Sequence, residues 1–329
     1  MPLDLSWIVR RVLRTLTPRV LFVAETEIWP NLLHGCRRRA IPVVLFNGRI
    51  SDRSFQSYRR FRFFFKQVLQ GVSAFAMQSE RDAERIVEIG APRDRIVVTG
   101  NLKFDRPDLH VSEDEKRAIR NSLGLREENT VFVAGSTHEG EEALILEAFR
   151  RLKQIEPSLL LILAPRHLER IDRVKKILEE GRFSWVCKSQ ISGERFPEVV
   201  LLDTMGELEK IYSIGTVVFV GRSLISGGGH NILEPAAFGK PVMFGPHMEN
   251  FRDVVRIMKS EGGGIEVRNQ KDLVEQAQRL LMDRSYYSRV SQAALRAIQN
   301  NQGATQKTLR VLEKYLREDT LSPNVYPPV

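Results

Sequence analysis

Cysteine is nearly absent from this chain of 329 residues, which contains only Cys36 and Cys187. The two lie far apart in the sequence, without the close spacing that is typical of metal sites. We therefore expect buried thiols rather than a disulfide or a metal centre. So little cysteine is also typical of proteins that work in a reducing compartment.

Long hydrophobic runs, internal repeats and low-complexity tracts are also absent from the sequence. A helix that spans a bilayer needs about 20 consecutive, mainly apolar residues, and no stretch approaches that length. Hydrophobic residues make up 42% of the chain and charged residues 28%, which is typical of a globular protein and not of a disordered or fibrous one. The length allows two domains of ordinary size.

Positive charge, in contrast, is abundant and unevenly distributed. The net charge is +9, and residues 1–105 contain 18 Lys and Arg against 10 Asp and Glu. Residues 37–66 contain nine basic residues and one acid, Asp52, with phenylalanines interleaved between 55 and 65. A basic and aromatic face of this kind attracts anionic membrane surfaces or, less favoured here, nucleic acid. The alternative is a solvated helix whose aromatic residues face the core.

Short apolar runs alternate with amphipathic segments of helical length, a pattern that predicts parallel sheets built from βα units. We expect strands at residues 19–24, 42–46, 73–77, 96–99, 130–134, 159–163, 199–202, 217–220 and 241–244. We expect helices, among others, at residues 79–89, 139–155, 169–180, 271–282 and 304–317. A polar run with Pro107 interrupts the pattern at residues 104–115, where we place a linker between two domains.

The strongest functional signal lies at residues 217–251. An apolar strand is followed by three glycines, then by His230, Asn231 and, at the start of a helix-like stretch, Glu234. In open parallel sheets, a strand, a glycine-rich loop and a helix present free backbone amides to a phosphate. The pattern favours nucleotide binding, with Glu234 placed to accept hydrogen bonds from ribose hydroxyls. The alternative is a helix capped by Asn231 with an acidic first turn.

Seven blocks of residues carry a family resemblance. They are ETEIWPNLL (25–33), NGRIS (47–51), TGNLKFD (99–105), AGSTHEGEE (134–142), LAPRH (163–167), DTMGEL (203–208) and the segment 227–251. In this order they resemble the 3-deoxy-D-manno-octulosonic acid (Kdo) transferases of lipopolysaccharide and lipid A biosynthesis. The resemblance extends from about residue 2 to about residue 315.

The resemblance implies an α/β fold of the GT-B class, with two Rossmann-like domains facing across a cleft and an incomplete first domain. The implied domains are a partial acceptor-binding domain at 1–106, a CMP-sugar-binding domain at 107–303, and a crossover helix and tail at 304–329. The implied reaction is an inverting transfer of Kdo from CMP-Kdo to a lipid A precursor (lipid IVA), without a cofactor or an essential metal. The sequence agrees, since it contains no Asp-x-Asp motif.

Three segments resemble those with which family members contact CMP. The donor-binding residues implied in this way are Pro165, Arg166, Met205, Gly206, Glu207, Asn231, Ile232, Leu233 and Glu234. Arg166 follows a predicted strand, where its guanidinium can donate charge-assisted hydrogen bonds to a phosphate. The alternatives are a surface arginine at a strand end and, for Glu207, a cap of the following helix.

Glu25 and Lys103 resemble family residues that stabilise the transition state. Both follow predicted strands, where open α/β sheets place their ligands. Lys103 could pair with the Kdo carboxylate or the departing phosphate, and Glu25 could stabilise cationic character at the anomeric carbon. The alternatives are an ordinary loop lysine and an ion pair between Glu25 and the region of Arg49 and Arg53. For these two arginines, binding of acceptor phosphates and intramolecular pairing are equally good interpretations.

Family members carry a further segment before the matched residues, with a hydrophobic anchor, a glycine-rich acceptor loop and a glutamate that acts as general base. This sequence contains no match to that segment. Because the attacking hydroxyl needs a base to accept its proton, we predict a weak or inactive transferase. The resemblance implies a peripheral protein at the cytoplasmic face of the bacterial inner membrane. Its implied partners are CMP-Kdo, the lipid A precursor and the anionic membrane surface.

Nucleic-acid binding is the weakest possibility, since the basic residues match no recognised binding motif. Two other functions stay open at this point. The first is a GT-B enzyme that uses a UDP-sugar, or a related epimerase, which a preference for UDP over CMP would reveal. The second is a non-catalytic nucleotide-binding fragment or membrane-surface module. Nucleotide binding without turnover would favour that second interpretation.

Overall fold

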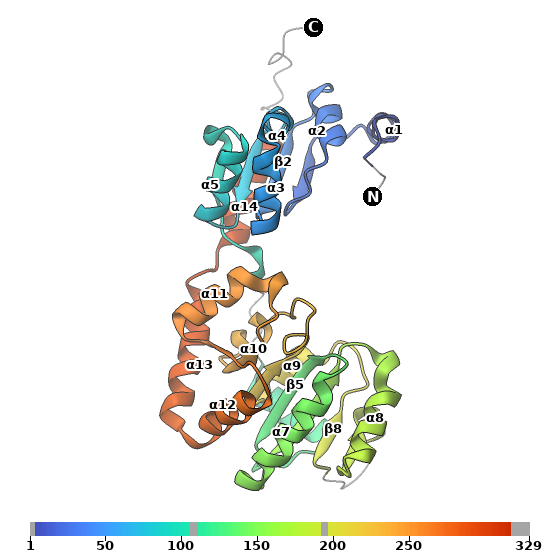
Figure 1. Cartoon of the computed structure of the whole chain (residues 1–329), viewed down its shortest axis with the longest axis vertical. Coiled ribbons are helices and arrows are strands. Elements are labelled where there is room, and N and C mark those ends of the chain that lie inside the picture. The colour runs from blue at the N-terminus through green and yellow to red at the C-terminus, as the bar shows by residue number, and fades with distance from the viewer. Residues whose placement is uncertain (1–3, 106–110, 192–196, 317–329) are drawn as a thin grey trace. The chain divides into compact units, whose positions relative to one another are not determined.

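The computed structural model describes residues 4–105, 111–191 and 197–316. The chain forms two compact units, each built on a parallel sheet (Figure 1). The N-terminal unit comprises residues 1–105 together with 301–329, and the C-terminal unit comprises residues 106–300. Part of the predicted linker, residues 106–110, lies outside the described residues, as does the tail from residue 317.

The N-terminal unit contains a four-stranded parallel sheet whose strands lie in sequence order. The strands are β1 (Leu21–Ala24), β2 (Val43–Gly48), β3 (Ala74–Met77) and β4 (Ile96–Val98). The helices are α1 (Ser6–Leu16), α2 (Pro30–Arg37), α3 (Asp52–Arg60), α4 (Arg62–Leu69), α5 (Glu80–Ile89) and α14 (Ala304–Leu316). In the core, Val43 and Phe75 of the strands pack with Leu33 and Ile86 of the helices, as expected when βα units bury both faces of a parallel sheet.

Helix α14 belongs to the N-terminal unit although some 200 residues separate it from the strands it covers. Val311 packs against Val44 and Ala74 on β2 and β3. The Tyr315 hydroxyl donates a hydrogen bond of 3.0 Å to the carbonyl of Ser73. At the start of the helix, the Asp105 carboxylate accepts hydrogen bonds from two backbone amides, one of them from Gly303 at 2.7 Å. The last helix is therefore fixed at both of its ends.

The basic and aromatic segment folds as two helices, α3 and α4, which meet at Phe61. Ser51 caps α3 by accepting a hydrogen bond of 3.1 Å from the backbone amide of Ser54. Phe55 is buried, but Phe61, Phe63 and Phe64 are 57%, 82% and 49% exposed. The core-facing stripe of the alternative interpretation is thus confirmed only in part, because three phenylalanines face solvent.

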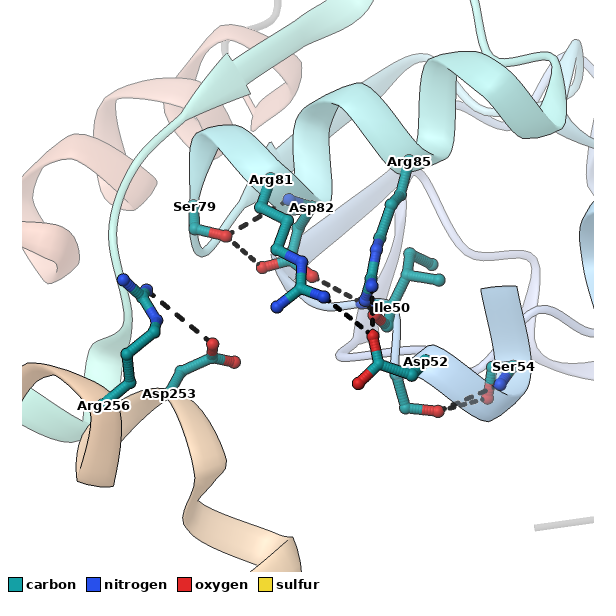
Figure 2. A network of polar contacts seen from close by, with 10 residues as sticks. Ile50, Asp52, Ser54, Ser79, Arg81, Asp82, Arg85, Asp253 and Arg256 are labelled. Carbon is teal, nitrogen blue, oxygen red and sulfur yellow. Dashed lines mark hydrogen bonds and ion pairs between the residues drawn. The ribbon is translucent and has the colours of Figure 1, made fainter. Parts of the chain in front are cut away.

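Hydrogen bonds and ion pairs attach the segment after β2 to the beginning of α5 (Figure 2). Asp82 accepts a hydrogen bond of 2.8 Å from the backbone amide of Ile50. Asp52, in the first turn of α3, forms ion pairs with Arg81, at 2.9 Å, and with Arg85. These contacts hold the NGRIS block, which carries Arg49, against a helix of its own unit.

The C-terminal unit contains a seven-stranded parallel sheet in the order β11-β10-β9-β5-β6-β8-β7. The strands are β5 (Val131–Thr137), β6 (Leu160–Pro165), β7 (Trp185–Cys187), β8 (Val199–Leu201), β9 (Val217–Val220), β10 (Val242–Phe244) and β11 (Gly264–Glu266). The helices are α6 (Glu113–Ser122), α7 (Glu141–Ile155), α8 (Ile171–Glu180), α9 (Leu208–Ile211), α10 (Leu233–Ala237), α11 (Arg252–Glu261), α12 (Gln270–Met282) and α13 (Arg284–Gln299). From β5 the chain continues to β6 on one side, and from β9 it continues to β10 on the other. The switch point, where such sheets bind ligands, therefore lies between β5 and β9.

All nine predicted strands are present, and the five predicted helices are present with shifts of one or two residues at their ends. Two strands of three residues each, β7 and β11, were not predicted. Their apolar runs are too short to be recognised, and β11 begins with Gly264, a residue that disfavours strands. Among the described residues, no helix is long and apolar enough to cross a membrane.

Candidate functional site

The carboxyl ends of β5 and β9 carry strained backbone on both sides of the switch point. Ser136, within β5, has φ of 54°, and Arg222, just after β9, has φ of 58°. Non-glycine residues in this left-handed region cost about 1 kcal/mol or more, and they gather at functional sites. In the N-terminal unit, Glu25 after β1 and Asn47 in β2 share this conformation, with φ of 56° and 49°.

A pocket of about 310 Å³ opens at this edge of the C-terminal sheet. Four predicted donor-binding residues line it, namely Arg166, Gly206, Asn231 and Glu234. They come from the segments after β6, β8 and β9, so all three predicted segments meet in one place. The pocket is also lined by His230, which sequence reasoning did not select.

The other five predicted donor-binding residues do not line this pocket. Ile232 and Leu233 are fully buried in the core, side chain and backbone alike, and the amide of Leu233 already donates to Asn231. Pro165 ends β6 with a buried side chain, whereas Met205 is 69% exposed. Glu207 precedes α9, but its side chain makes no cap hydrogen bond and instead accepts hydrogen bonds from Lys188 and Thr204.

The glycine loop is shaped mainly by its own chain. A Cβ on Gly228 would lie 2.3 Å from Nδ2 of Asn250, and one on Gly229 would lie 2.2 Å from Sδ of Met248. Both glycines have positive φ, of 93° and 73°. We expected these glycines to give a phosphate access to the backbone, but the structure shows another reason why glycine is needed at these two positions. A loop from beyond β10 packs where their side chains would be.

The helix after this loop is shorter than expected and begins later. Helix α10 has five residues, and Ile232 rather than Asn231 occupies its N-cap position. Asn231 still accepts a hydrogen bond of 3.2 Å from the backbone amide of Leu233, and it donates one of 3.4 Å to Glu234. So short a helix contributes little dipole. An anion at this site would therefore be attracted mainly by charged side chains and not by the helix dipole.

A buried carboxylate ties the segments after β5 and β9 together. Glu141 is fully buried and accepts backbone hydrogen bonds from His138 at 3.0 Å and from three consecutive residues of the other segment, 222–224, at 2.6, 2.9 and 3.0 Å. Burial raises the pKa of Glu141, while the four amide donors act in the opposite direction. N–H donors need acceptor lone pairs, so this geometry holds the carboxylate in its ionised form.

The next residue, Glu142, is also fully buried and forms an ion pair with Arg170 at 2.8 Å. Its carboxylate accepts a further hydrogen bond of 3.2 Å from the hydroxyl of Thr137. Sequence reasoning included both glutamates in a family block but assigned them no role. Two adjacent acids at the start of a helix usually face solvent, so only the structure reveals that both point inward.

Three histidines that are far apart in the sequence meet beside the pocket. Nε2 of His138 and Nε2 of His230 are 2.9 Å apart, and the ring of His167 lies edge-on to His138 at 5.2 Å. Burial, followed by neighbouring positive charges, lowers the pKa of His138 and of His230 to about 4 each. Within the described ranges, no group of three or more His, Cys, Asp or Glu side chains could hold a metal ion.

In the N-terminal unit, the sheet separates the two residues expected to stabilise the transition state. Glu25 follows β1 and Lys103 lies in a turn after β4, at opposite edges of the four-stranded sheet. Three strand spacings amount to about 14 Å. Glu25 lies 3.9 Å from Nε of Arg49, which favours the intramolecular alternative for that arginine. Asn47 positions the turn by accepting a hydrogen bond of 3.1 Å from the amide of Leu102.

Two family models match the chain. A model described as 3-deoxy-D-manno-octulosonic-acid transferase (kdotransferase) matches residues 1–106, and one described as glycosyl transferases group 1 matches residues 115–297. The 3-deoxy-D-manno-octulosonic acid transferase of Haemophilus influenzae is 35% identical over 323 residues, which cover 97% of this chain and 75% of that protein.

Solved structures agree with these matches. The C-terminal CMP-Kdo binding domain of WaaA from Acinetobacter baumannii is 31% identical, covers 56% of this chain and 97% of that one, and has a TM-score of 0.53. A glycosyltransferase from Rickettsia africae, at 13% identity, has a TM-score of 0.63 over 97% of this chain and 81% of its own, which shows the fold alone. With two α/β units on parallel sheets, the chain has the GT-B fold and belongs to the family of 3-deoxy-D-manno-octulosonic acid (Kdo) transferases, which are glycosyltransferases.

Proposed function

We propose that this protein transfers Kdo, with inversion, from CMP-Kdo to a lipid A precursor (lipid IVA). The observation that carries the proposal is the meeting of the segments after β6, β8 and β9 in one pocket at the switch point of the C-terminal sheet. The similarity to the C-terminal CMP-Kdo binding domain of WaaA from Acinetobacter baumannii supports the same donor.

The pocket supplies suitable groups for a cytidine nucleotide. The Arg166 guanidinium can donate two parallel hydrogen bonds to the phosphate, and Glu234 can accept hydrogen bonds from the ribose hydroxyls. Gly206 has φ of 84°, and no atom lies within 4 Å of the position of a Cβ. At this position glycine is therefore required by the backbone conformation. It leaves the adjoining amide and carbonyl accessible to the edge of a base.

The chemical step breaks the bond between the anomeric carbon and the phosphate oxygen, and CMP departs with the electron pair. A hydroxyl of the acceptor forms the new bond and loses its proton to a base. We assign Lys103 to the developing negative charge on the phosphate or to the sugar carboxylate, and Glu25 to the cationic anomeric carbon.

We assign the acceptor side to the surface formed by α3 and α4. Phe61, Phe63 and Phe64 are exposed there among arginines at positions 59, 60 and 62. Apolar rings that enter the headgroup region, combined with attraction to acidic lipids, bind a protein to the membrane surface without crossing it. We therefore propose peripheral attachment to the cytoplasmic face of the inner membrane. Phe63→Ser should weaken sedimentation with phosphatidylglycerol vesicles while leaving thermal stability unchanged.

Thermal unfolding with and without CMP tests the donor assignment, with UMP and UDP as controls. At 100 times its dissociation constant, a ligand stabilises the folded state by about 2.7 kcal/mol. We expect a rise in melting temperature that is selective for CMP. A rise with UDP alone would instead support the UDP-sugar alternative. Binding of CMP without detectable transfer would support a non-catalytic role.

A further inference from the structure

The contact between His138 and His230 joins the two segments that flank the switch point. His230 lines the donor pocket, whereas His138 is not among the residues that line it. Their ring planes are inclined by 26° with centroids 5.2 Å apart, and the rings meet edge to edge with the two Nε2 atoms 2.9 Å apart. Neither Nδ1 atom has a hydrogen-bond partner among the described residues, and neither is a buried unpaired atom. The Nδ1 atom of His230 is thus neither paired nor fully enclosed, and it belongs to a residue that lines the pocket.

A separation of 2.9 Å between two ring nitrogens requires one hydrogen between them. Two N–H groups would repel each other, as would two lone pairs. In the neutral pair, one ring therefore carries its hydrogen on Nε2 and the other on Nδ1. If His138 donates from Nε2, His230 must carry its hydrogen on Nδ1. The contact thus couples the two tautomers, so that His230 is a donor at Nδ1 only when His138 donates from Nε2.

The surroundings keep this pair neutral but attract anions. The charged and titratable groups around it are Arg166, His167 and Arg170 from the segment after β6, Arg222 after β9, Glu141 of α7 and Glu234 of α10. Glu141 already accepts four backbone hydrogen bonds, and Arg170 is paired with Glu142. Arg166 and Arg222 remain beside the pair as sources of positive potential.

We propose that His230 is a further donor-binding residue that donates a hydrogen bond from Nδ1 to the phosphate or carboxylate of the nucleotide sugar. We assign His138 as the positioning residue that fixes the ring and tautomer of His230. This inference rests on the donor pocket of the proposed function. A neutral hydrogen-bond donor would thus assist the charged Arg166 in binding an anion, to which the short helix α10 contributes little.

Calorimetric titration with CMP and with cytidine tests the proposal, because cytidine lacks the phosphate. His230→Ala should weaken CMP binding about 10- to 100-fold, as expected for a hydrogen bond to a charged group, and should change cytidine binding less than twofold. His138→Ala should weaken CMP binding by a smaller factor. His138→Gln, whose amide can replace Nε2 as a donor, should restore most of it. His34→Gln, on the surface of α2, is the matched control and should bind CMP as the wild type does.

The double variant His138→Ala with His230→Ala tests whether His138 affects CMP binding by positioning His230 or only by stabilising the fold. If His138 acts through His230, its removal should have no further effect once His230 is absent. Independent losses that add would overturn the positioning role. Imidazole ¹⁵N spectra of the wild-type protein provide a test without substitution. A hydrogen on Nδ1 of His230 together with one on Nε2 of His138 supports the proposal, whereas the reverse arrangement or two identical tautomers overturns it.

The proposal and the proposed function can fail separately. If the wild type binds CMP but His230→Ala binds it equally well, the inference is wrong and the donor assignment stands. If the wild type binds UDP and not CMP, yet the binding depends on His230, the inference stands and the donor assignment is wrong.

Discussion

The C-terminal sheet brings distant residues together, whereas the N-terminal sheet keeps them apart. In the C-terminal unit, β5 and β9 are neighbours and the chain leaves them in opposite directions, so residues from three segments line one pocket. In the N-terminal unit, the strands follow one another in sequence order. Glu25 and Lys103 therefore lie at opposite edges of the described sheet.

Strand order, and not the type of residue, accounts for this contrast. Each unit carries charged residues after parallel strands, and each has non-glycine residues with positive φ at that edge. Only a sheet with a switch point leaves a crevice between diverging loops. The C-terminal unit should therefore bind a nucleotide by itself. The residues of the N-terminal unit should act on turnover and not on nucleotide affinity.

Removal of the carboxylate that joins the two flanking segments should have the largest effect. Glu141→Ala leaves four backbone amides without their acceptor, and we expect a loss of about 4 kcal/mol in unfolding free energy. Glu141→Gln keeps one acceptor oxygen and should lose less. Urea denaturation measures both. Glu139→Ala, which removes only an exposed ion pair with Arg173, is the control, and a loss of similar size there would contradict the structural role of Glu141.

A comparison of Arg166→Ala with Lys103→Ala tests whether the C-terminal unit binds the nucleotide while the N-terminal unit acts only on turnover. The arginine variant should bind CMP about 10- to 100-fold more weakly, because a charge-assisted hydrogen bond contributes about 1.5–3 kcal/mol. The lysine variant should bind CMP with unchanged affinity and should lose transfer activity relative to the wild-type chain. If Lys103→Ala weakens CMP binding as much as Arg166→Ala does, the contrast between the units is wrong.

The fold was largely predictable because runs of apolar residues, some of them only three residues long, mark nine of the eleven strands of the two sheets. The donor segments were implied by the family resemblance, and that they bind a nucleotide stays a prediction. The prediction was incomplete where the direction of a side chain decides whether it faces the pocket or the core. Ile232 and Leu233 face the core, and a helix expected to continue to Gly239 ends at Ala237.

Residues that act through contacts distant in sequence could not be predicted. His138 and His230 are 92 positions apart, and Glu141 reaches amides more than 80 positions away. Nothing in their local sequence distinguishes them from surface residues. The strand order that unites them becomes visible only in the folded sheet.

Acid should destabilise the C-terminal unit through its histidine pair. In the folded protein both histidines have a pKa of about 4, below the ordinary value of 6.5. Above pH 6.5 both are neutral and the pair contributes in full. As the pH falls from 6.5 towards 4, the unfolded chain takes up protons that the folded chain does not, so stability is lost.

The double variant His138→Gln with His230→Gln should lose stability less steeply over this range in urea titrations, with His34→Gln as the control. A slope equal to that of the wild type would contradict the pKa assignments.

The smallest effect is expected at Asn47, the nearest equivalent of Glu141 in the N-terminal unit. Among the described residues, its side chain accepts one backbone hydrogen bond, from Leu102, and its φ of 49° suits asparagine or glycine better than other residues. Asn47→Ala should cost about 1–2 kcal/mol, through the lost hydrogen bond and the backbone strain. Asn47→Gly should cost less, because it removes the strain. Neither variant should alter CMP affinity. If one does, the N-terminal unit takes part in nucleotide binding and the contrast between the two sheets has to be abandoned.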